Sequence, residues 1–369
     1  MTRVIISGGG TGGHIFPAIA IANAIKYAEP AAEILFIGAE GRMEMERVPA
    51  AGYQIEGLRI SGLQRRLTLK NFIVPYRVIT SLMKAERIIR RFNPDVVIGV
   101  GGYASGPTLR MAMLKKIPTL IQEQNSYPGL TNKILGPNAD KICVAYDGME
   151  HFFPKNKLIL TGNPVRQNIV RRHGQLNEAL LHFGLEHDKK TILVTGGSLG
   201  SGTINRSIRN YLVNKGKADI QIIWQTGSYY YPEIHSDEEL NQLEHVKILP
   251  FIDRMDLAYS AADVIISRAG AIAISELCLV GKPIILIPSP NVTEDHQTKN
   301  ARALVIKNAA LMLKDSEAVE RLPVILEDLL KDESRQADLS ENILSLAIGN
   351  AAERIAHEAF ALAKQKNRK

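Results

Sequence analysis

The sequence contains little cysteine, with two such residues, Cys143 and Cys278, in 369. Both lie among apolar neighbours, and neither has a Cys or His partner at the spacing of a metal site. We therefore expect neither a disulfide framework nor a zinc site. Buried free thiols in a reducing cytoplasm are the simplest interpretation.

The sequence also lacks any run of about 18 apolar residues, the length needed for a membrane-spanning helix. Residues 1–7 lead directly into a strand-like run, without the basic region and apolar stretch of a secretory signal. We therefore expect a protein that is neither exported nor membrane-spanning. Aromatic residues make up 6% of the chain and no RNA or DNA motif is recognisable, so nucleic-acid binding is not favoured.

What the chain does contain is enough apolar sequence for two cores. Apolar residues make up 45% of it and charged residues 22%, a composition typical of globular proteins. The formal net charge of +7 favours an anionic partner, such as nucleic acid, anionic lipid or a phosphorylated substrate. Charge alone does not choose among these.

One stretch, residues 263–283, combines the signals of a strand, a tight turn and a helix. The apolar run at 264–266 is typical of a buried parallel strand, and from Ala271 the apolar spacing becomes helical. A helix N-terminus at the end of such a strand suits a pyrophosphate, and Glu276, one turn further on, is placed to accept hydrogen bonds from ribose hydroxyls. This stretch leaves open the alternative that Glu276 only complements the helix dipole.

A glycine-rich loop follows the first predicted strand, residues 3–7, and reads Gly-Gly-Gly-Thr-Gly-Gly-His over residues 8–14. Such a loop lets backbone N–H groups approach a phosphate, but its GxGxxG spacing is a weak signal by itself. A nicotinamide dinucleotide would need an acidic residue after the second strand, predicted at 34–38, and Glu40 stands there. His14 either takes part in the chemistry of the site or only begins the helix, with its side chain hydrogen-bonded to the backbone.

Further apolar runs predict parallel strands, and the pattern restarts in the second half of the chain. These strands are predicted at residues 95–100, 118–122, 140–145 and 158–160, and then at 191–195, 220–224, 246–249, 264–267 and 284–287. Glycine loops at 99–107 and 196–201 follow two of them. Ligands of open parallel sheets collect at the carboxyl ends of the strands. A polar segment at 162–175 marks the junction between two domains.

The sequence therefore predicts an α/β protein of the GT-B type, with two Rossmann-like, doubly wound parallel-sheet domains facing across a cleft. We expect one Rossmann-like domain at residues 1–163 and a second at 164–345. A C-terminal helix at 346–369 is expected to pack back on the first domain.

Six segments, in order, resemble the motifs of the MurG family: residues 9–14 (GGTGGH), 101–107 (GGYASGP), 123–125 (EQN), 162–166 (GNPVR), 196–198 (GGS) and 267–270 (SRAG). That family transfers N-acetylglucosamine from UDP-GlcNAc to undecaprenyl-diphospho-muramoylpentapeptide, turning lipid I into lipid II in peptidoglycan synthesis. The resemblance implies an inverting transferase that is peripheral on the cytoplasmic face of the bacterial inner membrane. It also implies that the domain at 1–163 takes the acceptor and associates with the membrane, and that the domain at 164–345 binds UDP-GlcNAc. Ser201 and Asn308 depart from the family pattern, which has a small residue such as Ala at the first position and often Gly at the second.

The resemblance assigns substrate binding to residues from both halves of the chain: Thr11, Gly12, Gly13, Asn125, Arg166, Ser198, Ile252, Ala271, Ile272, Ala273, Ile274, Ser275, Glu276 and Gln297. Physical chemistry agrees for Arg166 as a fixed cation and for Glu276 as a ribose ligand. Ile252 is expected to offer backbone groups to uracil. His14 is the candidate general base. No Asp-x-Asp sequence occurs, so neither a metal ion nor another cofactor is expected.

Three alternatives accompany this hypothesis. A UDP-GlcNAc 2-epimerase resembles the same two-domain layout, a nicotinamide enzyme would use Glu40, and a nucleic-acid or membrane-binding module would use the net positive charge. Formation of UDP-ManNAc without an acceptor would select the epimerase, a melting-temperature shift with NAD or NADP the nicotinamide enzyme, and steeply salt-dependent binding of random-sequence oligonucleotides the nucleic-acid module.

A membrane-binding surface is predicted within residues 63–92. One helical face there carries Phe72, Tyr76, Ile79 and Met83, and another carries Val74, Val78, Leu82, Ala85 and Ile89. One helix rarely needs two apolar stripes, so the second is expected to pack on the sheet and the first to stay exposed among Lys and Arg. That combination suits a peripheral protein on anionic lipid.

Overall fold

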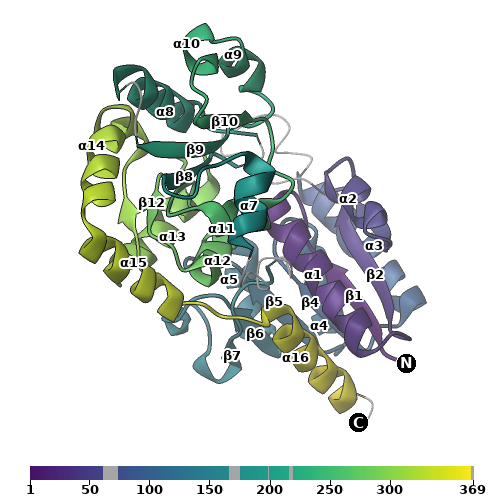
Figure 1. Ribbon diagram of the computed structural model, residues 1–369. Coiled ribbons are helices and arrows are strands. Elements are labelled where there is room, and N and C mark those ends of the chain that lie inside the picture. The colour runs from purple at the N-terminus through teal and green to yellow at the C-terminus, as the bar shows by residue number, and fades with distance from the viewer. Residues whose placement is uncertain (61–73, 166–174, 198, 216–218, 367–369) are drawn as a thin grey trace. The chain divides into compact units, whose positions relative to one another are not determined.

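The computed structural model describes residues 1–60, 74–165, 175–197, 199–215 and 219–366. The chain divides into two compact units (Figure 1). Unit 1 comprises Met1–Val165 and Asn350–Lys369, and unit 2 comprises Arg166–Gly349. The division after Val165 lies two residues beyond the boundary expected from sequence, and unit 1 is discontinuous along the chain.

Unit 1 is built on a parallel sheet with the strand order β3-β2-β1-β4-β5-β6-β7. Its strands are β1 (Arg3–Ser7), β2 (Glu33–Ala39), β3 (Gln54–Leu58), β4 (Val96–Gly99), β5 (Thr119–Glu123), β6 (Lys141–Val144) and β7 (Leu158–Leu160). All four residues of β4 and all five of β5 are buried. This explains the continuous apolar run of β4, which reads Val-Val-Ile-Gly, because a parallel sheet is covered on both faces.

Helices cover both faces of the unit 1 sheet. They are α1 (Gly12–Ala28), α2 (Glu44–Ala50), α3 (Val74–Phe92), α4 (Ser105–Leu114), α5 (Leu130–Leu135) and α16 (Ala351–Lys366), with short 3₁₀ turns at Gly136–Asn138, Met149–His151 and Lys155–Lys157. Val4 and Ile6 share one core with α1 and α16, and Ile5 shares the other with α3 and α4. Alternate residues of β1 thus feed opposite cores, as the pleat of a strand requires.

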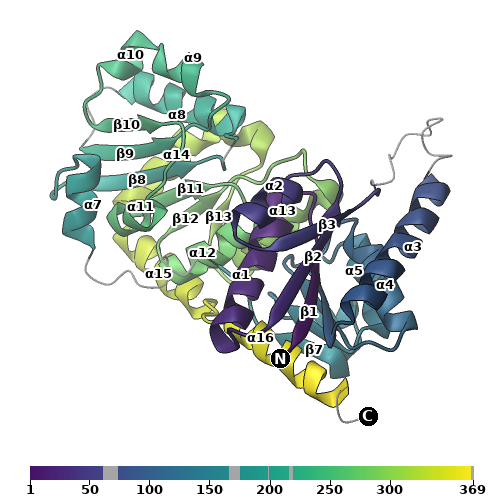
Figure 2. The same cartoon turned by 90° about the vertical axis from the view of Figure 1, so that its right-hand side faces the viewer.

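Helix α16 lies beside α1 although unit 2 separates the two helices in sequence (Figures 1 and 2). Ile355, Ala359 and Leu362 are buried in the core that α1 covers. Glu358 forms an ion pair with Lys141 of β6, and the Lys366 ammonium donates to the Pro94 carbonyl at 2.7 Å. The helix is therefore an integral part of unit 1.

Unit 2 repeats the architecture with a parallel sheet of order β10-β9-β8-β11-β12-β13, and Figure 2 shows β10, β9, β8 and β11 side by side. Its strands are β8 (Lys190–Thr195), β9 (Ile220–Gln225), β10 (Val246–Leu249), β11 (Val264–Ser267), β12 (Ile284–Leu286) and β13 (Leu311–Met312). Trp224 is fully buried in the core between this sheet and the helices α8 and α14. The predicted βαβ pattern of the second half is confirmed.

The helices of unit 2 include a series near its C-terminal end. They are α7 (Leu176–Phe183), α8 (Gly202–Lys215), α9 (Tyr231–His235), α10 (Glu238–Asn241), α11 (Met255–Ala261), α12 (Ala271–Val280), α13 (His296–Val305), α14 (Ala318–Lys331) and α15 (Glu333–Ser345), with 3₁₀ turns at Thr293–Asp295 and Asp315–Glu317. Among the described helices of either unit, none combines the length and apolarity needed to cross a membrane.

Candidate active site

A pocket of about 570 Å³, called the unit 2 pocket below, opens at the carboxyl ends of the unit 2 strands. Its walls come from the loops that follow β8, β9, β10, β11 and β12. Strands β8 and β11 are neighbours in the sheet but not consecutive in the chain. From β8 the chain adds β9 and β10 on one side of the sheet, and it then crosses back to add β11, β12 and β13 on the other side. Ligands of doubly wound sheets bind at such a switch point.

The glycine loop after β8 forms one wall of the unit 2 pocket and leads into α8. Gly200 has a φ of +84°, and a Cβ there would lie 2.0 Å from the carbonyl oxygen of Thr226. A side chain at Gly196 would likewise lie 2.5 Å from the backbone nitrogen of Ser201. Glycine is therefore required for this loop to approach the neighbouring backbone, and the first turn of α8 opens into the pocket with it.

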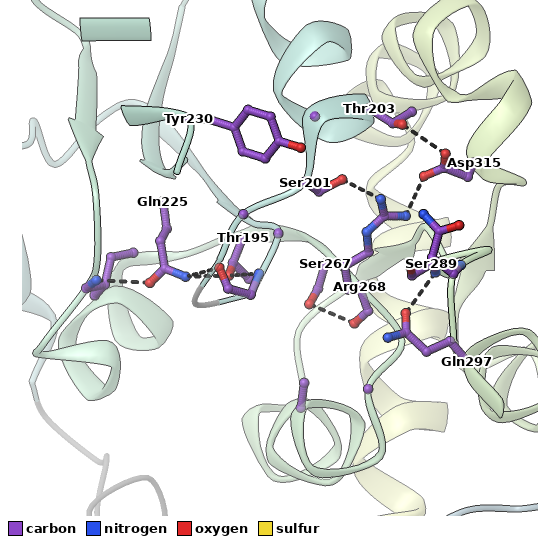
Figure 3. Close-up of a pocket in the computed structure, with 18 of the residues that line it drawn as sticks. Thr195, Ser201, Thr203, Gln225, Tyr230, Ser267, Arg268, Ser289, Gln297 and Asp315 are labelled. Atoms are coloured by element: carbon purple, nitrogen blue, oxygen red, sulfur yellow. Dashed lines mark hydrogen bonds and ion pairs between the residues drawn. The ribbon is translucent and has the colours of Figure 1, made fainter. Parts of the chain in front are cut away.

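Arg268, directly after β11, ties three walls of the pocket together (Figure 3). Its guanidinium donates to Asp315 and to the hydroxyl of Ser201, and to the carbonyl oxygens of Ile287 and Pro288 at 2.9 and 3.1 Å. The Asp315 carboxylate also accepts a hydrogen bond from Thr203 at 2.8 Å. The buried charge of Arg268 is thus compensated within the protein, and Ser201, a departure from the MurG family pattern, supplies one of its partners.

Gln225, the last residue of β9, fixes the loop that carries Ile252. Its side-chain oxygen accepts the Ile252 N–H at 2.9 Å, and its amide nitrogen donates to Thr195 Oγ1 at 3.2 Å and to the Gly197 carbonyl at 3.0 Å. Because the N–H of Ile252 is used in this way, the backbone group that Ile252 has left to offer a ligand is its carbonyl oxygen.

Glu276 and Gln297 enter the pocket from α12 and α13. Glu276 is 4% exposed, and Tyr259 donates a hydrogen bond to its carboxylate at 3.3 Å. The side-chain oxygen of Gln297 accepts the Ser289 N–H at 2.8 Å, as Figure 3 shows. The amide nitrogen of Gln297 has no partner among the described residues, so its two N–H groups remain to donate to a ligand.

In unit 1, the glycine loops after β1 and β4 pack against each other at the switch point of that sheet. A Cβ on Gly102, whose φ is +82°, would lie 2.3 Å from the carbonyl oxygen of Gly9. The His14 ring lies against Gly101, where a Cβ would come within 2.8 Å of it, and its Nδ1 is 3.2 Å from the Thr11 hydroxyl. Glycines in the second loop thus make room for the imidazole of the first.

Two buried carboxylates hold the loops of unit 1. Glu44, 1% exposed at the start of α2, accepts the backbone N–H of Gly10 at 2.9 Å and that of Ala39 at 3.0 Å. Glu123, at the end of β5, accepts the N–H and the side-chain amide of Asn125 at 3.0 and 3.1 Å, and on its other oxygen the amide of Asn132. Each acid fixes a loop on which a predicted site residue stands.

The predicted site residues are distributed over both units. Ile252, Ala273, Glu276 and Gln297 come together around the unit 2 pocket. Four other α12 residues, Ala271, Ile272, Ile274 and Ser275, are not among its lining residues, and Ile274 is buried. Thr11, Gly12, Gly13, His14 and Asn125 belong to unit 1. Arg166 and Ser198 lie outside the described residues.

Glu40, the residue that a nicotinamide site would require, has a different environment. Its carboxylate accepts from Lys84 at 2.8 Å and from Arg59 at 3.2 Å. The hydrogen bond from Lys84 is the main cause that holds the Glu40 pKa below its usual value. The carboxylate is therefore engaged in a surface ion-pair cluster.

Sequence reasoning missed Gln225, Tyr259, Arg268 and Asp315, all of which line the pocket. Gln225 carries a usable signal, because it directly follows a predicted strand, as site residues of parallel sheets commonly do. Asp315 had none, since its role depends on meeting Arg268 from 47 residues away. Among the described residues, no group of three or more His, Cys, Asp and Glu side chains is arranged to hold a metal ion.

Comparisons with known proteins match nearly the whole chain. Residues 4–144 match the glycosyltransferase family 28 N-terminal domain, and residues 191–358 match the glycosyltransferase family 28 C-terminal domain. A protein from Flavobacterium psychrophilum is 53% identical over 98% of this chain and 97% of its own length. A protein from Parabacteroides distasonis is 56% identical over 96% of this chain and 97% of its own length. Both are named UDP-N-acetylglucosamine--N-acetylmuramyl-(pentapeptide) pyrophosphoryl-undecaprenol N-acetylglucosamine transferase.

Solved structures agree on the fold. The crystal structure of Acinetobacter baumannii MurG matches with a TM-score of 0.81 and 26% identity, over 98% of this chain and 100% of that one. A UDP-GlcNAc 2-epimerase from Neisseria meningitidis, solved with UDP-GlcNAc bound, matches with a TM-score of 0.66 over 98% of this chain and 100% of that one. At 14% identity the epimerase shares the fold alone, which is the GT-B fold predicted from the sequence.

Proposed function

The chain belongs to glycosyltransferase family 28 and, within it, to the MurG family, and from this premise we propose that it is the N-acetylglucosaminyltransferase that turns lipid I into lipid II. Its donor is UDP-GlcNAc and its acceptor is undecaprenyl-diphospho-muramoylpentapeptide. Identity above 50% over nearly the full length of two relatives named for this reaction supports the proposal.

The observation that carries the proposal is the convergence of Ile252, Glu276 and Gln297 on the unit 2 pocket. The N–H of Ile252 is already bonded to Gln225, so its carbonyl oxygen is the backbone group left to accept a hydrogen bond from uracil N3–H. The Glu276 carboxylate suits the ribose hydroxyls, and the free amide N–H groups of Gln297 suit sugar hydroxyls. One pocket thus presents groups for the base, the ribose and the sugar of a nucleotide sugar.

The proposed chemistry is a single inverting displacement. The muramoyl 4-hydroxyl oxygen bonds to the anomeric carbon of UDP-α-GlcNAc, the bond from that carbon to the UDP oxygen breaks, and a β-1,4 linkage results. His14 takes the hydroxyl proton, and UDP leaves with the electron pair. Backbone N–H groups at helix N-termini stabilise the growing negative charge.

A nucleotide screen tests the donor. UDP-GlcNAc and UDP should raise the melting temperature of the protein, whereas UDP-galactose, GDP sugars and NAD should do so much less. With a lipid I analogue present, UDP-GlcNAc should yield the disaccharide product and UDP. Formation of UDP-ManNAc without acceptor would instead select the epimerase function, and a shift with NAD but not UDP would contradict the proposal.

We also propose that unit 1 rests on the cytoplasmic face of the bacterial inner membrane through residues 63–92. Within the described part of this segment, Tyr76, Ile79 and Met83 are exposed at 69%, 57% and 59% along one face of α3. Ala85 and Ile89, from the other predicted stripe, are buried against the sheet. An exposed apolar face on a helix whose opposite face is packed supports a surface contact with lipid.

The neighbourhood of that face supports the same proposal. Arg77, Arg87, Arg90 and Arg91 are exposed on α3, and α4, which packs beside α3, adds the exposed Leu114. Val78, expected to pack on the sheet, is 38% exposed instead, because it falls before the point where α3 meets the core. Phe72 lies outside the described residues, as does the side chain of Val74.

A further inference from the structure

The unit 2 pocket contains two described arginines in opposite situations, Arg206 and Arg268. The Arg268 side chain is 15% exposed, and its N–H groups go to Asp315, Ser201 and two carbonyl oxygens. A guanidinium so neutralised and so fully hydrogen-bonded holds loops together and has little left for a ligand. Its role is structural, which leaves the positive charge of the pocket to another residue.

Arg206, in the second turn of α8, is exposed and lines the pocket. No acidic side chain among the described residues pairs with it, whereas Arg209, one turn further along the same helix, pairs with Asp237 at 2.6 Å. An unpaired arginine that faces an open pocket is available to an anionic ligand.

The surroundings of Gly202, the first residue of α8, show where the Arg206 guanidinium lies. A Cβ on Gly202 would be 3.3 Å from Arg206 Nη1 and 3.1 Å from the Tyr230 hydroxyl. The two donors therefore meet over the start of the helix, where the first N–H groups have no partner within the helix and the dipole is positive. Gly202, having no side chain, leaves this approach open.

We propose that Arg206, together with the Tyr230 hydroxyl, binds the diphosphate of the nucleotide donor. The inference rests on the proposed function, since it takes the donor to be a UDP sugar. The planar guanidinium donates two parallel hydrogen bonds to phosphate oxygens, which makes it a better phosphate ligand than an ammonium group. Its contact with the leaving diphosphate also stabilises the charge that grows there during transfer.

The test is isothermal titration calorimetry of the full chain with UDP and with uridine. Arg206→Gln should weaken UDP binding by roughly 10- to 100-fold, the effect of losing a charged hydrogen bond, and should leave uridine binding unchanged. Arg206→Lys should give an intermediate loss, because it keeps the charge but not the planar fork. Tyr230→Phe should weaken UDP binding by a smaller factor.

Arg209→Gln is the matched control, since it removes the same charge from the same helix outside the pocket, and it should bind UDP as the wild type does. If Arg206→Gln binds UDP with wild-type affinity, this inference is overturned and the proposed function is not affected. An equal loss of affinity for UDP and for uridine in Arg206→Gln would overturn it too, because it would indicate a distorted pocket. Failure of the wild type to bind UDP would overturn both this inference and the proposed function.

Discussion

At the scale of single residues, the polar groups of the unit 2 pocket are divided between the protein and the ligand. Both ends of the Gln225 amide form hydrogen bonds with neighbouring loops. The Gln297 oxygen accepts a hydrogen bond within the protein, and its N–H groups are left for a ligand. Glu276 is held by Tyr259 at the edge of the space that a ribose would occupy. Orientation is fixed before the ligand arrives, so binding costs little further ordering of these side chains.

Glu276→Ala should raise the KM for UDP-GlcNAc by roughly 10- to 100-fold, the cost of losing a charged hydrogen bond to the ribose. Turnover at saturating donor should change less, because the ribose contact is felt in the ground state and the transition state alike. Steady-state kinetics measures both quantities. The decisive comparison is with 2′,3′-dideoxy-UDP: if the variant still prefers UDP over it as strongly as the wild type does, Glu276 is not the ribose ligand.

His14→Ala should lower kcat by about 10²- to 10⁴-fold, the usual contribution of a general base. Its affinity for UDP should stay within a factor of about 2, because the unit 2 pocket contains no part of the His14 loop. Single-turnover assays and calorimetry on the same preparation separate the two effects. Near-wild-type turnover, or equal losses in turnover and UDP affinity, would remove His14 from the mechanism.

Sequence analysis placed Glu276 but not Arg206 among the candidate site residues, although both line the unit 2 pocket, and the difference is physical. Glu276 follows a strand, a glycine turn and a helix start, so its position relative to a ligand is set by local sequence. Arg206 is one of many basic residues, and what singles it out is that no acidic side chain among the described residues pairs with it. That property depends on which side chains the fold brings near, including Tyr230 from 24 residues away, and no local pattern encodes it.

At the scale of elements, α3 carries the prediction about membranes. The double variant Ile79→Ser, Met83→Ser should weaken binding to vesicles rich in anionic phospholipid by roughly tenfold or more, since each exposed side chain loses about 1 kcal/mol or more of apolar burial. Activity on a short-chain acceptor in solution should be retained. Vesicle co-sedimentation at low salt measures the binding, and circular dichroism checks the fold.

The control for α3 is the pair Leu181→Ser, Ile306→Ser, which removes two exposed apolar side chains of unit 2. This control should bind vesicles as the wild type does. If both double variants sediment equally with the vesicles, or if the wild type does not bind at all, α3 is not the membrane contact.

Elements with continuous apolar runs were predicted well, and mixed ones were not. The first strand was placed at residues 3–7, where β1 lies, and the helix from Ala271 is α12. The analysis missed β3, which reads Gln-Ile-Glu-Gly-Leu, because it is an edge strand and its outer residues are not buried. Strand β13 was missed because two residues carry no periodicity.

At the scale of the whole molecule, both cysteines are protected by their unit's core. Burial is the main cause that raises the pKa of Cys143 and of Cys278 to about 12. At pH 8 neither thiol has appreciable thiolate, so the native protein should react very slowly with a thiol reagent. Two equivalents should react after denaturation. Rapid labelling of the native protein would contradict the buried environment of these residues.

The two-unit plan was readable from sequence because the strand and glycine-loop pattern restarts once. The sequence analysis gave the last helix its own segment at 346–369 and expected it to pack back on the first domain, and the structure places Asn350–Lys369 in unit 1. Ala356, Ala359 and Ala363 of that helix are buried in the core that α1 covers.

The discontinuity of unit 1 has a consequence during synthesis of the protein. A ribosome releases residues 1–165 first, but the face of that sheet beside α1 lacks the cover that α16 supplies until the whole of unit 2 has emerged. Unit 2 is one continuous segment and is free to fold in that interval. The nascent chain is therefore expected to leave the apolar side of β4, at Val96 and Ile98, open beside α1 until the helix made after unit 2 covers it.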